Sequence, residues 1–329
     1  MSPKGNFQLD IYLDNQSLLT SMKSDILNGL TSIPRQIPPK YFYDKFGSEL
    51  FEQITELPEY YPSRVESAIL VEIADSLIQR FQPRELIEIG AGYSTKTKII
   101  LDSMEKSGDL VRYIPLDVSE SAMRSAATIV NNIYPNLEIH AIVGDFEKHL
   151  IHIPSPTINR LVLFLGSTIG NLNTDQRKEF LVNIKNLLGP NDHFLLGIDL
   201  VKDVPTLEAA YNDAQAITAQ FNRNVLNVIN QHLGGNFVPG NFSHHAFFNS
   251  DHDRIEMHLV ANSLQKILIR ELGLNFEMPK GESIWTENSY KFNRVSAVES
   301  LAEAGLEVEN WYEDPDHMFA AVLSKRGSP

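Results

Sequence analysis

The sequence contains no cysteine among its 329 residues, which excludes disulfide bonds, thiolate metal sites and cysteine nucleophiles together. It has no apolar run that approaches the roughly eighteen residues needed for a membrane-spanning helix. The N-terminal stretch MSPKGNFQLDIYLDNQ lacks a cationic segment followed by an apolar block, so we expect no secretory signal. These absences favour a cytoplasmic protein that does not work at a membrane.

Basic residues are also in the minority. The 28 Lys and Arg residues face 42 Asp and Glu residues, and the formal net charge is -14. Nucleic-acid binding draws on clustered Lys and Arg, which this chain does not show, so we expect no nucleic-acid partner. No charged stripe or long heptad repeat indicates a protein partner, and a monomer is the default expectation.

A metal site is not expected either. The ten histidines form no HExxH motif. The adjacent His244 and His245 would point to opposite faces of a strand, so they cannot bind one metal ion together. We interpret them as surface or core residues.

From about residue 85 the sequence alternates short aliphatic runs with longer helical ones, which is typical of a parallel α/β sheet. Helices are expected to begin near Thr95 and Ser119, after Phe146, and at 173–175, where Thr or Asp can cap them. The expected strands are ELIEIG (85–90), VRYIPLDV (111–118), LEIHAIVGD (137–145), RLVLFLGS (160–167) and HFLLGIDLV (193–201).

After Val201 this rhythm is interrupted. One long amphipathic helix is expected over 206–233, with Gly234-Gly235 as its stop. Alternating segments follow, and the turn NSDHD between two of them predicts a hairpin. The α/β rhythm then returns with a helix that ends at Gly305. We therefore interpret residues 202–291 as an insertion into the sheet domain.

The N-terminal segment is assigned to the same inserted domain. It ends in IPPKYFYDKFGSELFEQITELPEYYPSR, a stretch dense in Pro, Tyr and Phe. Such loops cost entropy to order, so they usually pack on something. We expect one domain of residues 65–201 and 292–329, and a second of residues 1–64 and 202–291.

The stretch LIEIGAGYSTKTKII joins the first of these strands to a helix through Gly90-Ala91-Gly92. Glycines here allow backbone N–H groups to approach a ligand closely, because a Cβ would block the approach. The fingerprint for NAD continues to a third glycine, yet Thr95 stands at that place. Without that glycine, the diphosphate of NAD could not approach the backbone closely at this position.

Two more strand tips carry acids. Asp117 ends the second strand, where a carboxylate can accept hydrogen bonds from both ribose hydroxyls of an adenosine. Asp145 lies at the tip of the third strand and can accept a hydrogen bond from an adenine amino group, while the ring of Phe146 covers the base. Gly-x-Gly alone is a weak signal and aspartates are common at turns. In combination, the three tips indicate an adenosine site without a diphosphate, as S-adenosylmethionine requires.

Several longer blocks resemble a known family. These are PPKYFYDKFGSELFEQITELPEYYPSR, FLGSTIGNL, GIDLVKD, FNRNVL, NSDHDRIEMHL and TENSYKF. They resemble the histidine-specific Nα-methyltransferases of ergothioneine biosynthesis, over about residues 15 to 325. The resemblance implies an α/β fold in which a Rossmann-like class I methyltransferase sheet carries an inserted α+β substrate-binding domain. It also implies trimethylation of the α-amine of L-histidine to hercynine, with S-adenosylmethionine as donor.

The resemblance also implies roles for individual residues. Tyr60, Asn171 and Tyr211 would handle the reacting amino-acid head group, with Gly166 beside them. Glu287 and Ser289 would hold the imidazole, although a glutamate in a period-two strand would ordinarily face solvent. Met257 would line the imidazole end, and Tyr43 and Phe51 would help to close the pocket. The implied donor-site residues are Gly90, Gly92, Lys96, Asp117, Asp145 and Phe146.

Three other functions stay open at this point. The first is a methyltransferase of the same fold that acts on another amino acid, such as tryptophan. The second is an NAD-dependent oxidoreductase, against which the missing third glycine argues. The third is a binding module without catalytic activity, which the full set of donor-site residues disfavours.

Overall fold

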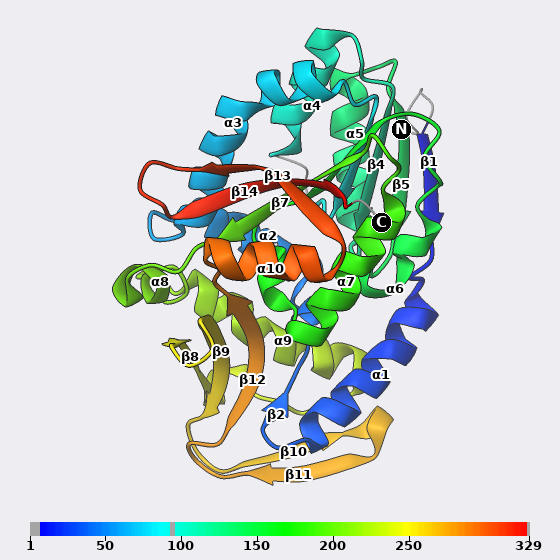
Figure 1. Ribbon diagram of the computed structural model, residues 1–329. Helices are drawn as coiled ribbons and strands as arrows, with labels where there is room; N and C mark the ends of the chain where they lie inside the picture. Colours follow the sequence, from blue (N-terminus) through cyan, green and yellow to red (C-terminus); the bar gives the residue numbers. More distant parts are fainter. Residues whose placement is uncertain (1–6, 93–95, 328–329) are drawn as a thin grey trace. The chain divides into compact units, whose positions relative to one another are not determined.

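The computed structural model describes residues 7–92 and 96–327, so the expected helix start near Thr95 lies outside the described residues. The chain divides into two compact units. The first comprises Met1–Leu13, Pro62–Val201 and Lys291–Pro329, and the second comprises Asp14–Tyr61 and Lys202–Tyr290. Each unit is built from segments that are distant in the sequence (Figure 1).

The first unit contains an eight-stranded sheet in the order β1-β5-β4-β3-β6-β7-β14-β13. Strands β1, β5, β4, β3, β6 and β7 run parallel to one another. Strand β14 is antiparallel to its two neighbours, β7 and β13, so β13 again runs in the direction of the other strands. The strand bounds are β1 Phe7–Ile11, β3 Glu85–Ile89, β4 Arg112–Asp117, β5 Glu138–Val143, β6 Arg160–Phe164, β7 His193–Asp199, β13 Leu306–Glu313 and β14 Phe319–Arg326. The five strands expected between residues 85 and 201 are thereby confirmed.

Helices cover both faces of this sheet. One face shares a core with α3, α4 and α5, which includes Leu70, Leu101 and Val130. On the other face, Phe180 of α7 packs on Phe164 of β6, with ring centroids 4.5 Å apart. Strands covered on both faces read as nearly continuous apolar runs. The helices are α3 Tyr61–Phe81, α4 Thr97–Ser107, α5 Glu120–Ile133, α6 Phe146–His149, α7 Thr174–Leu187 and α10 Arg294–Glu303, with 3-10 turns η2 Leu150–His152 and η3 Thr168–Asn171.

The helix starts and stops follow local capping chemistry. Ser119 caps α5, and Asn173 forms a capping box with Gln176 at the start of α7. Gly305, with φ of 78°, follows the last turn of α10. These boundaries agree with the expected ones.

The second unit contains a four-stranded sheet in the order β2-β12-β9-β8 and a separate β10-β11 hairpin. The NSDHD turn joins antiparallel β8 and β9, as expected. The strands are β2 Arg35–Gln36, β8 Phe242–Asn249, β9 Arg254–Ala261, β10 Gln265–Ile269, β11 Leu274–Met278 and β12 Ser283–Tyr290. The helices are α1 Asn15–Thr31, α2 Lys45–Thr55, α8 Val204–Ala209 and α9 Ile217–Leu233, with 3-10 turns η1 Pro39–Phe42, η4 Pro239–Asn241 and η5 Arg270–Leu272.

Two expectations about these units are wrong. Residues 1–64 do not all belong with the insertion, because β1 pairs in parallel with β5 at the edge of the large sheet. The amphipathic stretch 206–233 is not one helix either. It breaks between α8 and α9, where Ala216 adopts φ of 57° and the Asp213 carboxylate accepts the backbone N–H groups of Ile217 and Thr218. The helix stop at Gly234, with φ of 64°, is as expected.

Candidate functional site

The register of the large sheet brings the expected donor-site residues to one edge. The backbone N–H of Gly90 donates to Leu116 O at 2.8 Å, so the glycine turn lies beside the end of β4. The N–H of Gly144 donates to Asp117 O at 2.9 Å, which places Asp145 next along the edge. The strands β3, β4 and β5 follow one another on one side of the sheet, whereas β6 and β7 lie on the other side of β3. The strand order therefore reverses between β3 and β6, and ligands of open α/β sheets bind at such a switch point.

The glycine turn needs glycine for its backbone conformation. Gly90 has φ of 70° and Gly92 has φ of 50°, which L side chains rarely adopt. The N–H of Gly92 donates to Asp117 Oδ2 at 2.9 Å, and the N–H of Ser119 donates to Oδ1 at 2.9 Å. Burial raises the pKa of the Asp117 carboxyl, and these two hydrogen bonds oppose that shift. The carboxylate is thus fixed at the tip of β4, beside the turn.

Asp145 is a buried acid that also begins α6. Its Oδ1 accepts the N–H of Glu147 at 3.0 Å, and its own N–H donates to His149 Nδ1 at 2.9 Å. The ring of Phe146 contacts Phe164 and Phe180 edge-on, at centroid distances of 5.3 and 5.6 Å. Asp145 and Phe146 therefore hold fixed orientations at the end of β5.

A further carboxylate lies at the switch point, and the sequence did not indicate it. Glu66 of α3 is 0% exposed, and its carboxylate accepts the N–H of Gly166 at 2.8 Å and forms an ion pair with Lys96 Nζ. A Cβ at Gly197 of β7 would overlap Glu66 Oε1. A glycine inside an otherwise apolar strand was the available signal for a close approach.

The loop after β6 is equally constrained. Gly166 and Ser167 both have positive φ, of 74° and 56°. The Ser167 hydroxyl accepts the N–H of Asp199 at 2.9 Å, and the Asp199 carboxylate forms a buried ion pair of 2.8 Å with Lys291. These contacts hold the start of the 3-10 turn η3, which ends at the half-buried Asn171.

In the second unit, the expected aromatic residues form a continuous chain of ring contacts. The centroid distances are 5.6 Å for Tyr43–Phe51, 6.3 Å for Phe51–Tyr60 and 6.4 Å for Tyr60–Tyr211, all close to edge-on. The buried Phe221 of α9 contacts Tyr43 and Phe51 and was not predicted. Tyr211 itself lies in the break between α8 and α9, so the expectation that it lies on a long helix is wrong.

One of the residues expected to hold an imidazole, Ser289, contacts Tyr211. The Tyr211 hydroxyl donates to Ser289 Oγ at 2.7 Å. Ser289 is buried, and so is Met257 of the neighbouring strand β9. Glu287 lies directly opposite Met257 in the β12–β9 register, and directly paired residues share one face of a sheet. Ser289, Met257 and Glu287 are therefore presented on the same face.

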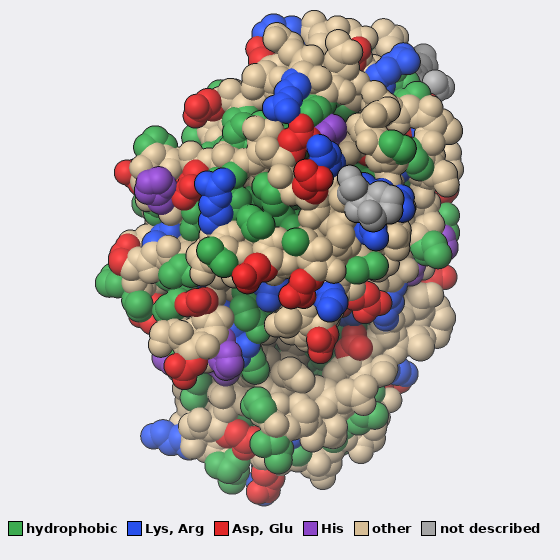
Figure 2. Space-filling model, viewed as in Figure 1, with side chains coloured by type: hydrophobic (Ala, Val, Ile, Leu, Met, Phe, Trp, Pro, Cys, Tyr) green, Lys and Arg blue, Asp and Glu red, His purple; other side chains and the backbone are tan. Residues whose placement is uncertain are grey.

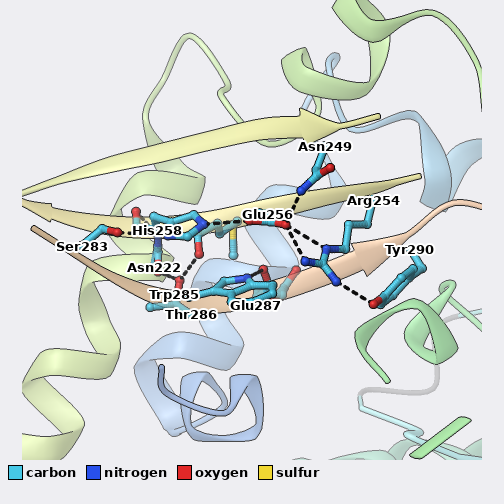
Figure 3. Close-up of polar contacts among 11 residues, drawn as sticks. Asn222, Asn249, Arg254, Glu256, His258, Ser283, Trp285, Thr286, Glu287 and Tyr290 are labelled. Carbon is cyan, nitrogen blue, oxygen red and sulfur yellow. Dashed lines mark hydrogen bonds and ion pairs between the residues drawn. The ribbon is translucent and has the colours of Figure 1, made fainter. Parts of the chain in front are cut away.

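The opposite face of this sheet carries a polar and aromatic network (Figure 3). Arg254 donates two hydrogen bonds to Glu256 Oε1, at 2.9 and 2.7 Å, and a third to the Tyr290 hydroxyl at 2.6 Å. Glu256 Oε2 lies 3.1 Å from His258 Nε2. The Trp285 indole is stacked with His258 at a centroid distance of 5.9 Å. Sequence periodicity did not indicate this network.

The two adjacent histidines of β8 do point to opposite faces. His244 is opposite Leu259 and His245 is opposite His258. Within the described residues, no three His, Asp or Glu side chains are grouped closely enough to hold a metal ion. None of the helices in the described ranges is long and apolar enough to cross a bilayer. On the face drawn in Figure 2, the coloured acidic and basic side chains are interspersed.

Known proteins match this chain over nearly its whole length. A family model described as histidine-specific methyltransferase, SAM-dependent, matches residues 22–326. The histidine N-alpha-methyltransferase of Mycolicibacterium smegmatis is 45% identical, over 96% of this chain and 98% of that protein. The protein of the same name from Mycobacterium tuberculosis is 42% identical, over 93% and 95% of the two chains.

A solved structure shows the same fold. An S-adenosylmethionine-dependent methyltransferase from Clostridium acetobutylicum matches with a TM-score of 0.51, over 85% of this chain and 99% of that one. At 10% sequence identity, this likeness concerns the fold alone. The predicted fold class, a Rossmann-like class I methyltransferase sheet with an inserted α+β domain, is confirmed.

Proposed function

Because the chain belongs to the family of histidine-specific, S-adenosylmethionine-dependent methyltransferases, we propose that it methylates the α-amine of L-histidine. Three successive transfers give hercynine, a step of ergothioneine biosynthesis. The observation that carries this proposal is the family match over residues 22–326. We propose further that the protein acts in the cytoplasm, as a monomer, on small molecules. Light scattering after gel filtration measures the molar mass and so tests whether the protein is a monomer.

The residues at the edge of the large sheet fit the proposed donor. Gly90 and Gly92 bring backbone close to a ligand without a Cβ in the way. Asp117 and Asp145 supply carboxylate acceptors for ribose hydroxyls and an adenine amino group, and Phe146 supplies a ring for the base. Lys96 offers an ammonium group to the carboxylate of the methionine portion. When bound, S-adenosylmethionine supplies a methyl group on a sulfonium leaving group.

The second unit supplies the groups that would recognise histidine. We assign Glu287 and Ser289 to the imidazole, with Met257 beside them. A carboxylate and a hydroxyl strongly reject a side chain without N–H groups, because such a substrate leaves them unpaired. Tyr211 orients Ser289 through the 2.7 Å hydrogen bond.

The contribution of the protein to the transfer is positioning. A neutral nitrogen lone pair must lie about 3 to 3.5 Å from the methyl carbon and in line with the breaking C–S bond. We assign the amino-acid head group to four residues that would orient it: Tyr60, Gly166, Asn171 and Tyr211. Each of the first two transfers forms a C–N bond and releases a proton from nitrogen, toward water or a nearby acceptor.

The growing cation is a second feature that the site must accommodate. The rings of Tyr43, Phe51 and Tyr60 contact one another in sequence. A cation over such a ring gains about 0.5 to 2 kcal/mol. This attraction rises as the amine becomes a permanently charged trimethylammonium group, so the aromatic patch favours continued methylation.

The test is incubation with S-adenosylmethionine and each of the twenty amino acids, followed by mass spectrometry. L-Histidine alone should gain one, two and three methyl groups, and fragmentation should place them on the α-nitrogen. Methylation of tryptophan instead would support the alternative substrate. Methylation of no amino acid would overturn the proposal.

A further inference from the structure

The β12 strand contains a bulge that decides which way Glu287 faces. Trp285 is opposite His258 and Glu287 is opposite Met257, so two steps along β12 correspond to one step along β9. In a regular strand, residues two apart share a face. The extra residue, Thr286, therefore moves Glu287 from the face of Trp285 to the face of Met257.

The bulge is held from both faces of the sheet. On one face, the Trp285 indole Nε1 donates to the backbone carbonyl of Glu287 at 2.9 Å. On the other face, the buried Thr286 hydroxyl lies 2.7 Å from Asn222 Oδ1 and 3.0 Å from Met257 O. The indole hydrogen bond thus links Trp285 and Glu287, the two residues on either side of the bulge, and fixes the backbone carbonyl of Glu287.

The indole is itself held in place by its neighbours. The Arg254 guanidinium lies over its ring at 4.6 Å, and the His258 ring lies nearly parallel to it, at an interplanar angle of 12°. Glu256 is hydrogen-bonded to both of these residues. Figure 3 shows the side chains of Arg254, Glu256, His258 and Trp285 grouped along β9 and β12.

We infer that Trp285 is a positioning residue for the side chain that selects the substrate. Its N–H locks the β12 bulge in the register that presents Glu287 on the face of Met257 and Ser289. This inference rests on the proposed function, in which Glu287 recognises the imidazole. The indole contacts no reacting group; it acts through the backbone of Glu287.

The experiment compares Trp285→Phe with Trp311→Phe. The sequence has two tryptophans, and the indole of Trp311 likewise donates one hydrogen bond, to Glu313 Oε2 at 3.0 Å. Trp285→Phe should raise the KM for L-histidine about fivefold, the factor for one modest hydrogen bond, with little change in kcat. The Kd for S-adenosylmethionine should stay unchanged, and the share of methylated histidine formed from an equimolar amino-acid mixture should fall. Trp311→Phe should change none of these values.

The outcomes separate this inference from the proposed function. If the unaltered protein does not methylate histidine, the proposed function fails. If it does, and Trp285→Phe matches Trp311→Phe in KM and selectivity, the role of Trp285 fails. Should Trp285→Phe not fold, 3-benzothienylalanine can replace the remaining tryptophan of Trp311→Phe, because it keeps the ring shape without an N–H. An unchanged KM for that protein would likewise overturn the inference.

Discussion

Gly197 leaves the space that the carboxylate of Glu66 occupies. A Cβ at Gly197 would overlap Glu66 Oε1 and approach the ring of Phe319 at 3.3 Å. The carboxylate in that space reaches the Gly166 N–H and Lys96 Nζ. Glu66 of α3 can therefore place its carboxylate at the switch point of the sheet because residue 197 of β7 is a glycine.

Gly197→Ala should destabilise the protein, because the added methyl group must displace a buried carboxylate from its partners. Overpacking of this kind costs about 1 to 3 kcal/mol in the free energy of unfolding. Urea denaturation measures the change. The control is Gly240→Ala, because no atom lies within 4 Å of a Cβ there. Equal stability of the two variants would show that the carboxylate moves away freely.

Lys96→Met should be more destabilising than Glu66→Gln. Glu66 is 0% exposed in its side chain and Lys96 is 25% exposed, so a lone lysine can be hydrated whereas a lone glutamate cannot. Removal of one partner of a buried pair costs about 3 to 5 kcal/mol. Urea denaturation of both variants beside the unaltered protein measures the two losses in the free energy of unfolding. A larger loss in Glu66→Gln than in Lys96→Met would contradict this explanation.

The proximity of the proposed donor-site residues could be predicted because each lies at the end of a strand or directly after it. Parallel strands end at one edge, so Gly90, Asp117 and Asp145 had to come together once the strands were identified. Glu287 could not be predicted from its pattern, since period two places it on the face of Trp285 and the bulge leaves no compositional mark. Its role came from family resemblance alone.

Two features of the helices could not be predicted from the sequence either. A glutamate such as Glu66 on a 21-residue helix is ordinarily exposed, and its burial here follows from its tertiary partners. The break before α9 was missed because apolar residues continue at helical spacing through it. There the Asp213 cap and the left-handed Ala216 override the periodic pattern.

Tyr211→Phe should weaken L-histidine binding far more than S-adenosylmethionine binding. The change removes one hydroxyl, and with it the hydrogen bond that orients Ser289. We expect a loss of about 1 kcal/mol, or roughly fivefold in Kd for histidine. Ser289→Ala should produce a similar loss, and the double variant should lose little more than either single one. Isothermal titration with both ligands is the measurement; fully additive losses would show that the two hydroxyls act independently.

Glu287→Ala should relax substrate selectivity. Without the carboxylate, the imidazole N–H loses its acceptor and other aromatic amino acids no longer leave a charge unpaired. The matched control is Glu277→Ala in β11, where the removed carboxylate is exposed and forms an ion pair with the exposed Lys266. Competition between histidine, phenylalanine and tryptophan, read by mass spectrometry, compares the variants. Unchanged discrimination in Glu287→Ala would remove this residue from the assigned role.

Acid should destabilise the second unit through His244. Its Nε2 donates to Tyr211 O at 2.8 Å, so its Nδ1 must accept from the Asn222 amide at 2.9 Å, and the ring is neutral. Burial lowers the pKa of His244, with the nearby Arg223 and His245 acting in the same direction, while Asp213 and the bond to Tyr211 oppose the shift.

The sign of the effect follows from proton counting. The unfolded chain binds the proton near the ordinary histidine pKa of about 6.5, whereas the folded chain binds it only at lower pH. The free energy of unfolding is therefore constant above that value and falls below it, by at most about 1.4 kcal/mol per pH unit for this group. Urea denaturation between pH 7.5 and 5 should show a shallower fall for His244→Gln than for the control His245→Gln, whose side chain is exposed. Equal slopes in the two variants would assign the acid sensitivity to other histidines, such as His258, whose pKa burial also lowers.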